Sequence, residues 1–319
     1  MNIGLDIDKI YNESNLDTMR KIFSNKIHLT VTSPPYGTLR SYDSMKSWSF
    51  DTFKSIAKEL YRITEKGGVV AWIVNDQITD GSQSCMSFKQ AIFFKEECGF
   101  NLNETIIFEK DQVLRKGGNR YTDIFEYVFI LSKGKPKIFN PIKTRCSIEY
   151  IKSKPRVSSL RDPNNDDKLI DNWCVNKKGP RNTTKVISNI WEYTVGGGST
   201  PDKIAYKHPA TFPEELVRDI IYSYSNPKDI IYDPFAGSGT TLKQAILMDR
   251  HWIGSELSKK YVDEIIIPRL KKYIFIKKSN IDLIGDINTE LIKNKYNNIV
   301  DRLYEDSGQK PIKQTEIVF

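Results

Sequence analysis

The sequence predicts an α/β protein built on a doubly wound, Rossmann-like sheet with helices on both faces. Short apolar runs rich in β-branched residues alternate with segments of helical periodicity. A glycine-rich turn joins one such run to a helix, and an acidic residue follows the next run. Together these observations match the pattern of a mononucleotide-binding half-sheet.

Composition narrows the class of protein. The chain has 319 residues, of which 39% are hydrophobic, enough for one elaborated domain or two. No apolar run is long enough for a membrane span, and Met1–Asp6 does not resemble a signal peptide, so we expect a cytoplasmic protein. We expect neither a disulfide framework nor a metal site, because the cysteines form no C-x-x-C pair and the histidines lack metal-ligand spacing. These residues are Cys85, Cys98, Cys146, Cys174, His28, His208 and His251.

Positive charge is concentrated in one region. The whole chain carries a formal net charge of +8. Between residues 133 and 190, fourteen Lys or Arg stand against five Asp or Glu, so the net charge of this segment, +9, exceeds that of the chain. An excess confined to one region suits a polyanionic partner.

Regular elements alternate along the first 132 residues. A strand and turn near residues 9–14 come first, and Glu65–Gly68 is expected to end the second helix because its two glycines disfavour helical conformation. Asn75-Asp76 follows a strand where open α/β sheets bind ligands. Glu126, inside a later strand, is expected at an exposed sheet edge. The other expected elements are helix 19–23, strand 27–31, helix 50–63, strand 69–74, helix 87–98 and strands 104–109 and 124–132.

The motif Ser33-Pro34-Pro35-Tyr36 follows the strand 27–31. Two consecutive prolines fix φ and remove two backbone donors, which leaves the carbonyls of Ser33 and Pro34 as acceptors that can face a cleft. The Ser33 hydroxyl stands beside them, and the Tyr36 ring can stack on a planar ligand. A proline-stiffened strand exit with a core tyrosine is the alternative interpretation. The polar stretch 37–49 is expected to form a loop over the cleft.

Two basic segments are candidates for contact with a polyanion. Residues 114–122 place basic side chains around two glycines and are expected to form a mobile loop. Between about 133 and 195 the α/β alternation breaks, and basic residues interleave with aromatic ones in Asn-, Ser- and Pro-rich chain, as in nucleic-acid readers. A solvated insertion is the alternative there. The basic residues are Arg115, Lys116, Arg120, Lys152, Lys154 and Arg156, and the aromatic ones are Tyr150, Trp173 and Trp191.

The α/β pattern returns after Gly196–Gly198, which we expect to act as a flexible joint. Phe212-Pro213-Glu214-Glu215 opens a helix, with Pro213 in its first turn and the glutamates complementing its positive end. A strand 230–232 leads into Asp233-Pro234-Phe235-Ala236-Gly237-Ser238-Gly239-Thr240-Thr241, followed by a helix 242–248 and a strand 251–255. Two glycines let the backbone approach a ligand closely, and Glu256 can accept both ribose hydroxyls. Thr240-Thr241 stands where a P-loop needs Lys-Ser/Thr, so we expect a nucleoside without a phosphate chain.

Taken together, these motifs and their order resemble the amino-methylating DNA methyltransferases of restriction-modification systems, in the permuted β-class order. The matching stretches are residues 32–37, 119–133, 208–221, 233–241 and 254–261. In that family the S-P-P-Y motif precedes the target-recognition region and the F-x-G-x-G motif follows it, as here. The resemblance implies a catalytic role for Ser33, Pro34, Pro35 and Tyr36. It also implies S-adenosylmethionine binding by Thr211, Phe212, Pro213, Asp233, Phe235, Gly237, Gly239, Thr240 and Glu256.

The resemblance also implies a domain division, and the chain departs from the family at one position. Residues 1–132 form the catalytic half, 133–195 the target-recognition region, 196–275 the cofactor-binding half and 276–319 a C-terminal extension. Relatives have an early aspartate where this chain has Ser14, so the contact to the cofactor's adenine is open, and Glu13 is the candidate substitute after a one-residue shift.

The implied activity is methyl transfer to an exocyclic amine in duplex DNA, by base flipping and without a covalent enzyme intermediate. Serine at the first motif position goes mostly with cytosine in this family, so we expect the N4 nitrogen of cytosine to be the target. N6-adenine methylation is the alternative, followed by RNA or small-molecule methylation and by a DNA-binding regulator without turnover. A cognate restriction endonuclease is a possible partner.

Overall fold

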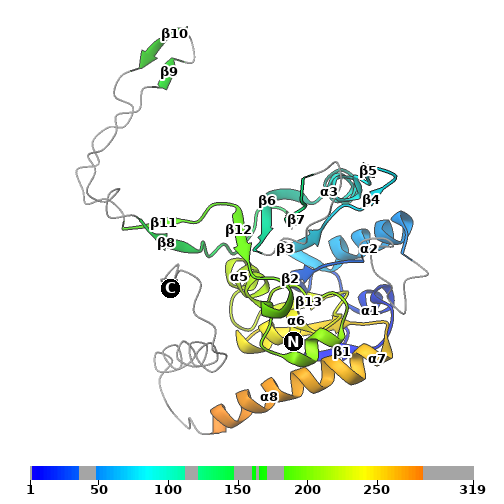
Figure 1. Cartoon of the computed structure of the whole chain (residues 1–319). Helices are drawn as coiled ribbons and strands as arrows, with labels where there is room; N and C mark the ends of the chain where they lie inside the picture. The colour runs from blue at the N-terminus through cyan, green and yellow to red at the C-terminus, as the bar shows by residue number, and fades with distance from the viewer. Residues whose placement is uncertain are drawn as a thin grey trace. The chain divides into compact units, whose positions relative to one another are not determined.

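An eight-stranded sheet in the order β1-β14-β13-β2-β3-β7-β6-β12 organises most of the chain (Figure 1). Strand β7 runs antiparallel to both of its neighbours, and every other neighbouring pair in this sheet is parallel. The strands are β1 (Lys9–Tyr11), β2 (Ile27–Thr32), β3 (Thr64–Val74), β6 (Asn101–Lys110), β7 (Phe125–Ser132), β12 (Ile190–Tyr193), β13 (Ile230–Asp233) and β14 (His251–Ser255). This sheet confirms the predicted α/β fold class.

The computed structural model describes residues 2–35, 48–111, 121–146, 160–162, 165–170 and 183–282. The chain divides into two units. The larger comprises Met1–Asn140 with Ser188–Lys310 and contains the eight-stranded sheet, and the smaller comprises Pro141–Ile187 with Pro311–Phe319. Among the described residues, no helix is long and apolar enough to cross a membrane.

Successive side chains of a strand point to opposite faces of the sheet, and buried side chains form a core on each face. Val70, Trp72 and Val74 of β3 join one cluster of buried side chains with Phe53 and Phe94, which come from helices α2 and α3. The intervening β3 residues are also buried, on the opposite face, where α5 packs against β2 and β3 and α6 packs against β13 and β14. The helices are α1 (Asn15–Lys21), α2 (Phe50–Ile63), α3 (Met86–Glu96), α5 (Glu214–Tyr224), α6 (Thr240–Leu247), α7 (Lys259–Tyr261) and α8 (Ile267–Asp282).

Short elements complete the fold. The 3-10 turns η2 (Gly196–Gly198) and η3 (Lys203–Lys207) precede α5, and the π-turn η4 (Val262–Ile266) links α7 to α8. The hairpin β4 (Ile78–Thr79) and β5 (Ser82–Gln83) follows β3. In the smaller unit, β8 (Lys143–Arg145) pairs with β11 (Thr184–Val186), and β9 (Leu160–Asp162) pairs with β10 (Asn165–Ile170).

Some sequence expectations hold and others are wrong in detail. Helix α2 ends at Ile63, before Glu65–Gly68 as predicted, but the strand expected from residue 69 already begins at Thr64 and includes these residues. Glu126 is not at an exposed edge: β7 lies between β3 and β6, and the carboxylate accepts a 2.8 Å ion pair from Lys110. Gly196–Gly198 forms a 3-10 turn, and its role as a flexible joint stays a prediction.

The region expected to be irregular, 133–195, ends in a strand of the main sheet. Trp191 and Tyr193 of β12 are buried, and the Trp191 indole donates to the Ser188 carbonyl at 2.9 Å. Trp191 therefore packs in the fold and does not serve as an exposed reader. Tyr150 and Trp173 lie outside the described residues.

Candidate active site

The two sequence motifs meet because their strands are neighbours. Strand β2 pairs in parallel with β13, so Ser33-Pro34-Pro35 and the glycine-rich turn both leave the sheet at its carboxyl edge. The buried Thr32 hydroxyl donates to Asp233 Oδ1 at 2.7 Å, and the Thr241 hydroxyl donates to the Val31 carbonyl at 3.2 Å. These contacts fix the first motif beside the second.

The glycine-rich turn needs its glycines for two different reasons. Gly237 and Gly239 have φ values of 53° and 77°, in the left-handed region that favours glycine. A Cβ on Gly237 would also lie 3.1 Å from the His208 ring, which packs edge-on against Tyr261 at a centroid distance of 4.6 Å. The sequence motif around His208 therefore covers the turn.

Glu256 closes the turn from β14. Its Oε2 accepts from the Gly237 N–H and its Oε1 accepts from the Ser258 N–H, both at 2.9 Å. Burial raises the pKa of this carboxyl above its ordinary value, although the two backbone N–H groups favour the charged form. Each carboxylate oxygen retains acceptor capacity for a ligand hydroxyl.

Asp233 is the most deeply buried acid of the turn. Its Oδ1 accepts from Thr32 and from the Phe235 N–H at 3.0 Å, whereas Oδ2 has no hydrogen-bond partner among the described residues. Burial raises the pKa of this carboxyl to about 6, against the effect of those hydrogen bonds. The turn therefore holds an incompletely compensated carboxylate that suits a cationic ligand.

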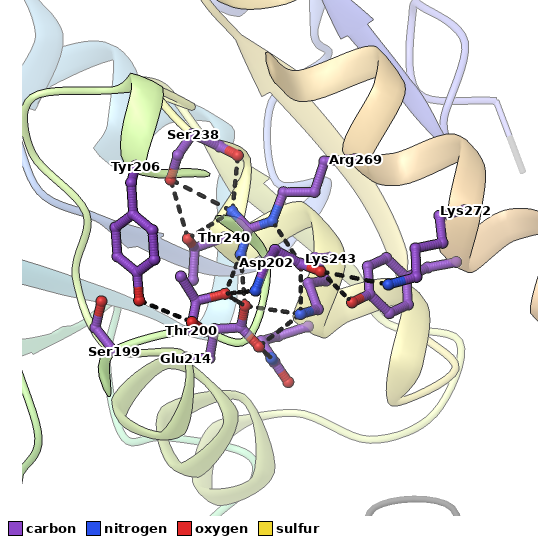
Figure 2. Close-up of polar contacts among 12 residues, drawn as sticks. Ser199, Thr200, Asp202, Tyr206, Glu214, Ser238, Thr240, Lys243, Arg269 and Lys272 are labelled. Atoms are coloured by element: carbon purple, nitrogen blue, oxygen red, sulfur yellow. Dashed lines mark hydrogen bonds and ion pairs between the residues drawn. The ribbon is translucent and has the colours of Figure 1, made fainter. Parts of the chain in front are cut away.

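Behind the turn lies a buried ion cluster of Asp202, Glu214, Lys243 and Arg269, drawn in Figure 2. Lys243 Nζ contacts Asp202 Oδ2 at 2.8 Å and Glu214 Oε1 at 2.7 Å. Arg269 contacts Asp202 Oδ2 at 3.0 Å and Glu214 Oε1 at 2.5 Å. Glu214 stands in the first turn of α5, as the sequence predicts, and is in addition an ion-pair partner of Lys243 and Arg269.

The ion cluster braces the turn. Arg269 Nη1 donates to the Ser238 carbonyl at 2.8 Å and to the Thr240 hydroxyl at 3.0 Å, so α8 holds the turn directly (Figure 2). Burial would raise the pKa of Asp202, but Lys243, the Tyr273 hydroxyl and Arg269 together lower it to about 2. Both buried cations are thus engaged by carboxylates of the protein.

A pocket opens on the other side of Pro34, at the ends of β2 and β3. Trp48 lines it and packs edge-on against Phe235 with a centroid distance of 5.5 Å, which places the pocket next to the glycine-rich turn. The lining residues are Pro34, Pro35, Trp48, Ser49, Phe50, Val74, Asn75, Gln77, Ser84, Met86 and Gln90. Most of this surface is apolar and suits a planar ring.

The sequence analysis did not predict the β4-β5 hairpin, which follows β3 and is flanked by residues that line this pocket. Asp80 and Gly81 both have positive φ and form the two-residue turn of the β4-β5 hairpin, so the dipeptide Asp-Gly was the available signal. Asp76 then accepts from the Ser84 hydroxyl at 2.7 Å and from the Ser87 N–H at 3.1 Å, which fixes the start of α3. The sequence predicts Asp76 at the ligand-binding edge of the sheet. In the structure its carboxylate does not line the pocket; it holds Ser84 and the start of α3, which form part of the pocket wall.

The structure brings some of the predicted residues together. Ser33, Pro34 and Pro35 lie beside Asp233, Phe235, Gly237, Gly239, Thr240 and Glu256 at one edge of the sheet. Thr211 and Phe212 are partly exposed before Pro213, which is the N-cap of α5 and precedes its first turn. Glu13 contacts Lys21 at 2.5 Å, and Ser14 caps α1. Tyr36, Arg115, Lys116, Arg120, Lys152, Lys154 and Arg156 lie outside the described residues.

Comparison with known proteins agrees with this arrangement. Residues 27–267 match the N6/N4 DNA methylase family model. The chain is 46% identical over 253 residues to the orphan methyltransferase M.BamHII of Bacillus amyloliquefaciens, covering 79% of this chain and 91% of that protein. It is 26% identical over 273 residues to the DNA adenine methyltransferase YhdJ of Escherichia coli K12, covering 81% of each.

Solved structures share the fold. The PvuII DNA methyltransferase, described as cytosine-N4-specific, superposes with a TM-score of 0.59 at 21% identity and 92% coverage of both chains. The complex of M1.HpyAVI with S-adenosylmethionine superposes with a TM-score of 0.51 at 22% identity, covering 82% of this chain and 98% of that one.

Proposed function

Because the chain belongs to the N6/N4 DNA methylase family of restriction-modification type, we propose that it methylates the 4-amino nitrogen of cytosine within a specific sequence of duplex DNA. S-adenosylmethionine is the methyl donor. The observation that supports this most is the Thr32 to Asp233 hydrogen bond, which holds the Ser33-Pro34-Pro35 acceptors beside the glycine-rich turn. A donor on the turn and an amine at the prolines would then face each other.

The turn fits this methyl donor better than a phosphate-bearing nucleotide. Asp233 and Glu256 supply negative charge, and Glu256 can accept the ribose hydroxyls of the adenosine. The buried cations nearest the turn, Lys243 and Arg269, are engaged by Asp202 and Glu214. When bound, the donor supplies a methyl group activated by a positively charged sulfur.

The other half of the site activates the amine. Its lone pair is delocalised into the base ring, so it is a poor nucleophile. Hydrogen bonds from its two N–H groups to the Pro34 carbonyl and the Ser33 hydroxyl favour a pyramidal nitrogen, while Tyr36 stacks on the base. With the donor bound, the nitrogen would form a bond to the methyl carbon while the carbon–sulfur bond breaks with its electrons on sulfur, and the methylated, positively charged amine would release one proton to water.

The DNA contacts remain proposals. The target base must leave the duplex, at a cost of a few kcal/mol that stacking and hydrogen bonds offset. Arg115, Lys116, Arg120, Lys152, Lys154 and Arg156 are proposed to bind the phosphates, and residues 133–195 to select the sequence. A cognate endonuclease stays a prediction.

N6-adenine methylation is the second candidate, because the DNA adenine methyltransferase YhdJ of Escherichia coli K12 is 26% identical to the chain over 273 residues. Ser33 favours cytosine: its hydroxyl accepts from an amine or donates to the adjacent ring nitrogen, whereas a carboxylate only accepts.

Transfer of labelled methyl from S-adenosylmethionine tests the proposal. We expect label in duplex DNA, none in RNA, and loss of transfer in Ser33→Ala with cofactor binding retained. Ser55→Ala, on the exposed side of α2, is the matched control and should keep full activity. Label in RNA alone would indicate an RNA methyltransferase, and DNA binding without transfer would indicate a regulator.

A further inference from the structure

Gln90, on α3, is a buried polar side chain that the functional motifs do not include. It is 4% exposed and lines the pocket together with Pro34 and Pro35. A buried amide without partners for its hydrogen-bonding groups is costly, so the contacts of this side chain indicate what it does.

The orientation of the Gln90 amide is fixed by Trp72. The indole Nε1–H of Trp72, a residue with 0% exposure, donates to Gln90 Oε1 at 2.8 Å. Because an indole can only donate, the amide oxygen must face Trp72 and the amide nitrogen must face away from it. A side chain that can normally donate and accept is thereby restricted to donating. Within the described ranges, Gln90 Nε2 has no hydrogen-bond partner.

Two neighbouring polar side chains are already engaged. The Asn75 amide donates to Asp123 Oδ2 at 2.9 Å and to the Phe125 carbonyl at 3.2 Å, and its oxygen accepts from the Asp76 N–H at 2.8 Å. The Ser84 hydroxyl donates to Asp76 and accepts from the Met86 N–H at 3.3 Å. The Gln90 N–H groups therefore stand among apolar surface and engaged polar groups.

We propose that Gln90 is a specificity-determining residue that donates a hydrogen bond to the ring nitrogen next to the target amine. The inference rests on the proposed function, in which the flipped base enters this pocket beside Pro34. Cytosine N3 and adenine N1 accept a hydrogen bond, whereas the corresponding ring nitrogens of thymine and guanine carry hydrogen and donate. A donor fixed at this position selects bases with an amine beside an acceptor and rejects the other two.

The variant Gln90→Glu tests this with little change of shape. One carboxylate oxygen still accepts from Trp72, and the other replaces the amide donor with an acceptor. We expect kcat/KM for DNA to fall by roughly 100-fold, because an acceptor then faces an acceptor, with the dissociation constant of S-adenosylmethionine within about twofold of wild type. Gln83→Glu, on the exposed strand β5, adds the same charge and should leave kcat/KM unchanged.

A modified substrate separates direct contact from a structural role. In duplex DNA whose target carries carbon in place of the acceptor nitrogen (3-deazacytosine, or 1-deazaadenine for an adenine target), wild-type kcat/KM should fall by about tenfold or more, and Gln90→Glu should show no such further fall. Equal losses in both proteins, or wild-type kcat/KM in Gln90→Glu, would overturn the inference. Absence of methyl transfer by the wild type would instead overturn the proposed function.

Discussion

The two sides of the candidate site satisfy their buried polar groups in opposite ways. On the cofactor side, Lys243 and Arg269 are neutralised by Asp202 and Glu214 of the same chain. On the target side, the Gln90 amide donors face an apolar pocket and have no partner among the described residues. The two buried cations of the cofactor side are therefore neutralised before any ligand binds, whereas the Gln90 donors are proposed to be paired only by the substrate. We expect changes in the ion cluster to act on stability and changes at Gln90 to act on selectivity.

The largest expected effect comes from breaking the ion cluster. Arg269→Met should lower the free energy of unfolding by about 3–5 kcal/mol, since it leaves an excess of buried carboxylate charge. Urea unfolding monitored by circular dichroism measures it. Lys272→Gln is the control: it removes a 3.7 Å contact to the same Asp202 from a side chain that is 61% exposed, and should cost less than about 1 kcal/mol. A loss in Arg269→Met as small as that expected for the control would show that the cluster does not stabilise this side.

The pH dependence of the free energy of unfolding tests the buried carboxyl of Asp233 on the cofactor side. Its folded pKa of about 6 lies above the ordinary value of 3.8, so the folded state is progressively destabilised as pH rises from about 4 to above 6. Asp233→Asn keeps the acceptor for Thr32 but cannot ionise. It should therefore gain roughly 3 kcal/mol of stability relative to wild type between pH 4 and pH 7, at about 1.36 kcal/mol per pKa unit. Parallel curves of stability against pH for the two proteins would contradict this.

Removing Glu256 tests whether the cofactor side binds the donor. Glu256→Ala should weaken S-adenosylmethionine binding by about 1.5–3 kcal/mol, the range for hydrogen bonds to a charged group. Isothermal titration calorimetry measures it, with Asp263→Ala in the nearby exposed ion pair as control. Wild-type affinity in a folded Glu256→Ala protein would remove Glu256 from the site.

The smallest effect concerns DNA affinity and disappears at high salt. We replace Lys152, Lys154 and Arg156 together with Gln. The slope of the logarithm of the DNA-binding constant against the logarithm of salt concentration should become less negative by roughly 2–3, because each lost phosphate contact contributes about 0.9. The affinity for the cofactor should be unchanged. Fluorescence anisotropy over a salt series measures the slope. An unchanged slope would transfer the role to Arg115 and Arg120.

Local patterns predicted the strands and the glycine-rich turn because each depends on a short run of residues. Strands β2 and β13 follow from β-branched apolar runs, and Gly237 and Gly239 from a motif whose backbone conformation requires them. The position of β12 could not be predicted, for two reasons. Its four residues lie in a basic segment and are too few to show a clear alternation of apolar and polar residues, and its pairing partner β6 is distant in sequence.

The ion cluster and the Gln90 donor were missed for a related reason. In the sequence, nothing distinguishes the members of the ion cluster from ordinary surface charges. They are buried together only because η3, α5, α6 and α8 pack against one another; the members are Asp202, Glu214, Lys243 and Arg269. Gln90 reads as a polar residue in a helix, and its role depends on Trp72 of β3. Contacts between residues far apart in sequence carry no local pattern.

Mass spectrometry of nucleosides from methylated DNA tests the central claim most directly. Duplex DNA is incubated with the protein and S-adenosylmethionine and digested to nucleosides, which are separated and weighed. The proposed site, with Ser33 beside Pro34 and Pro35, predicts N4-methylcytosine as the product. N6-methyladenine as the sole product would contradict the assignment and show that Ser33 does not report the target base.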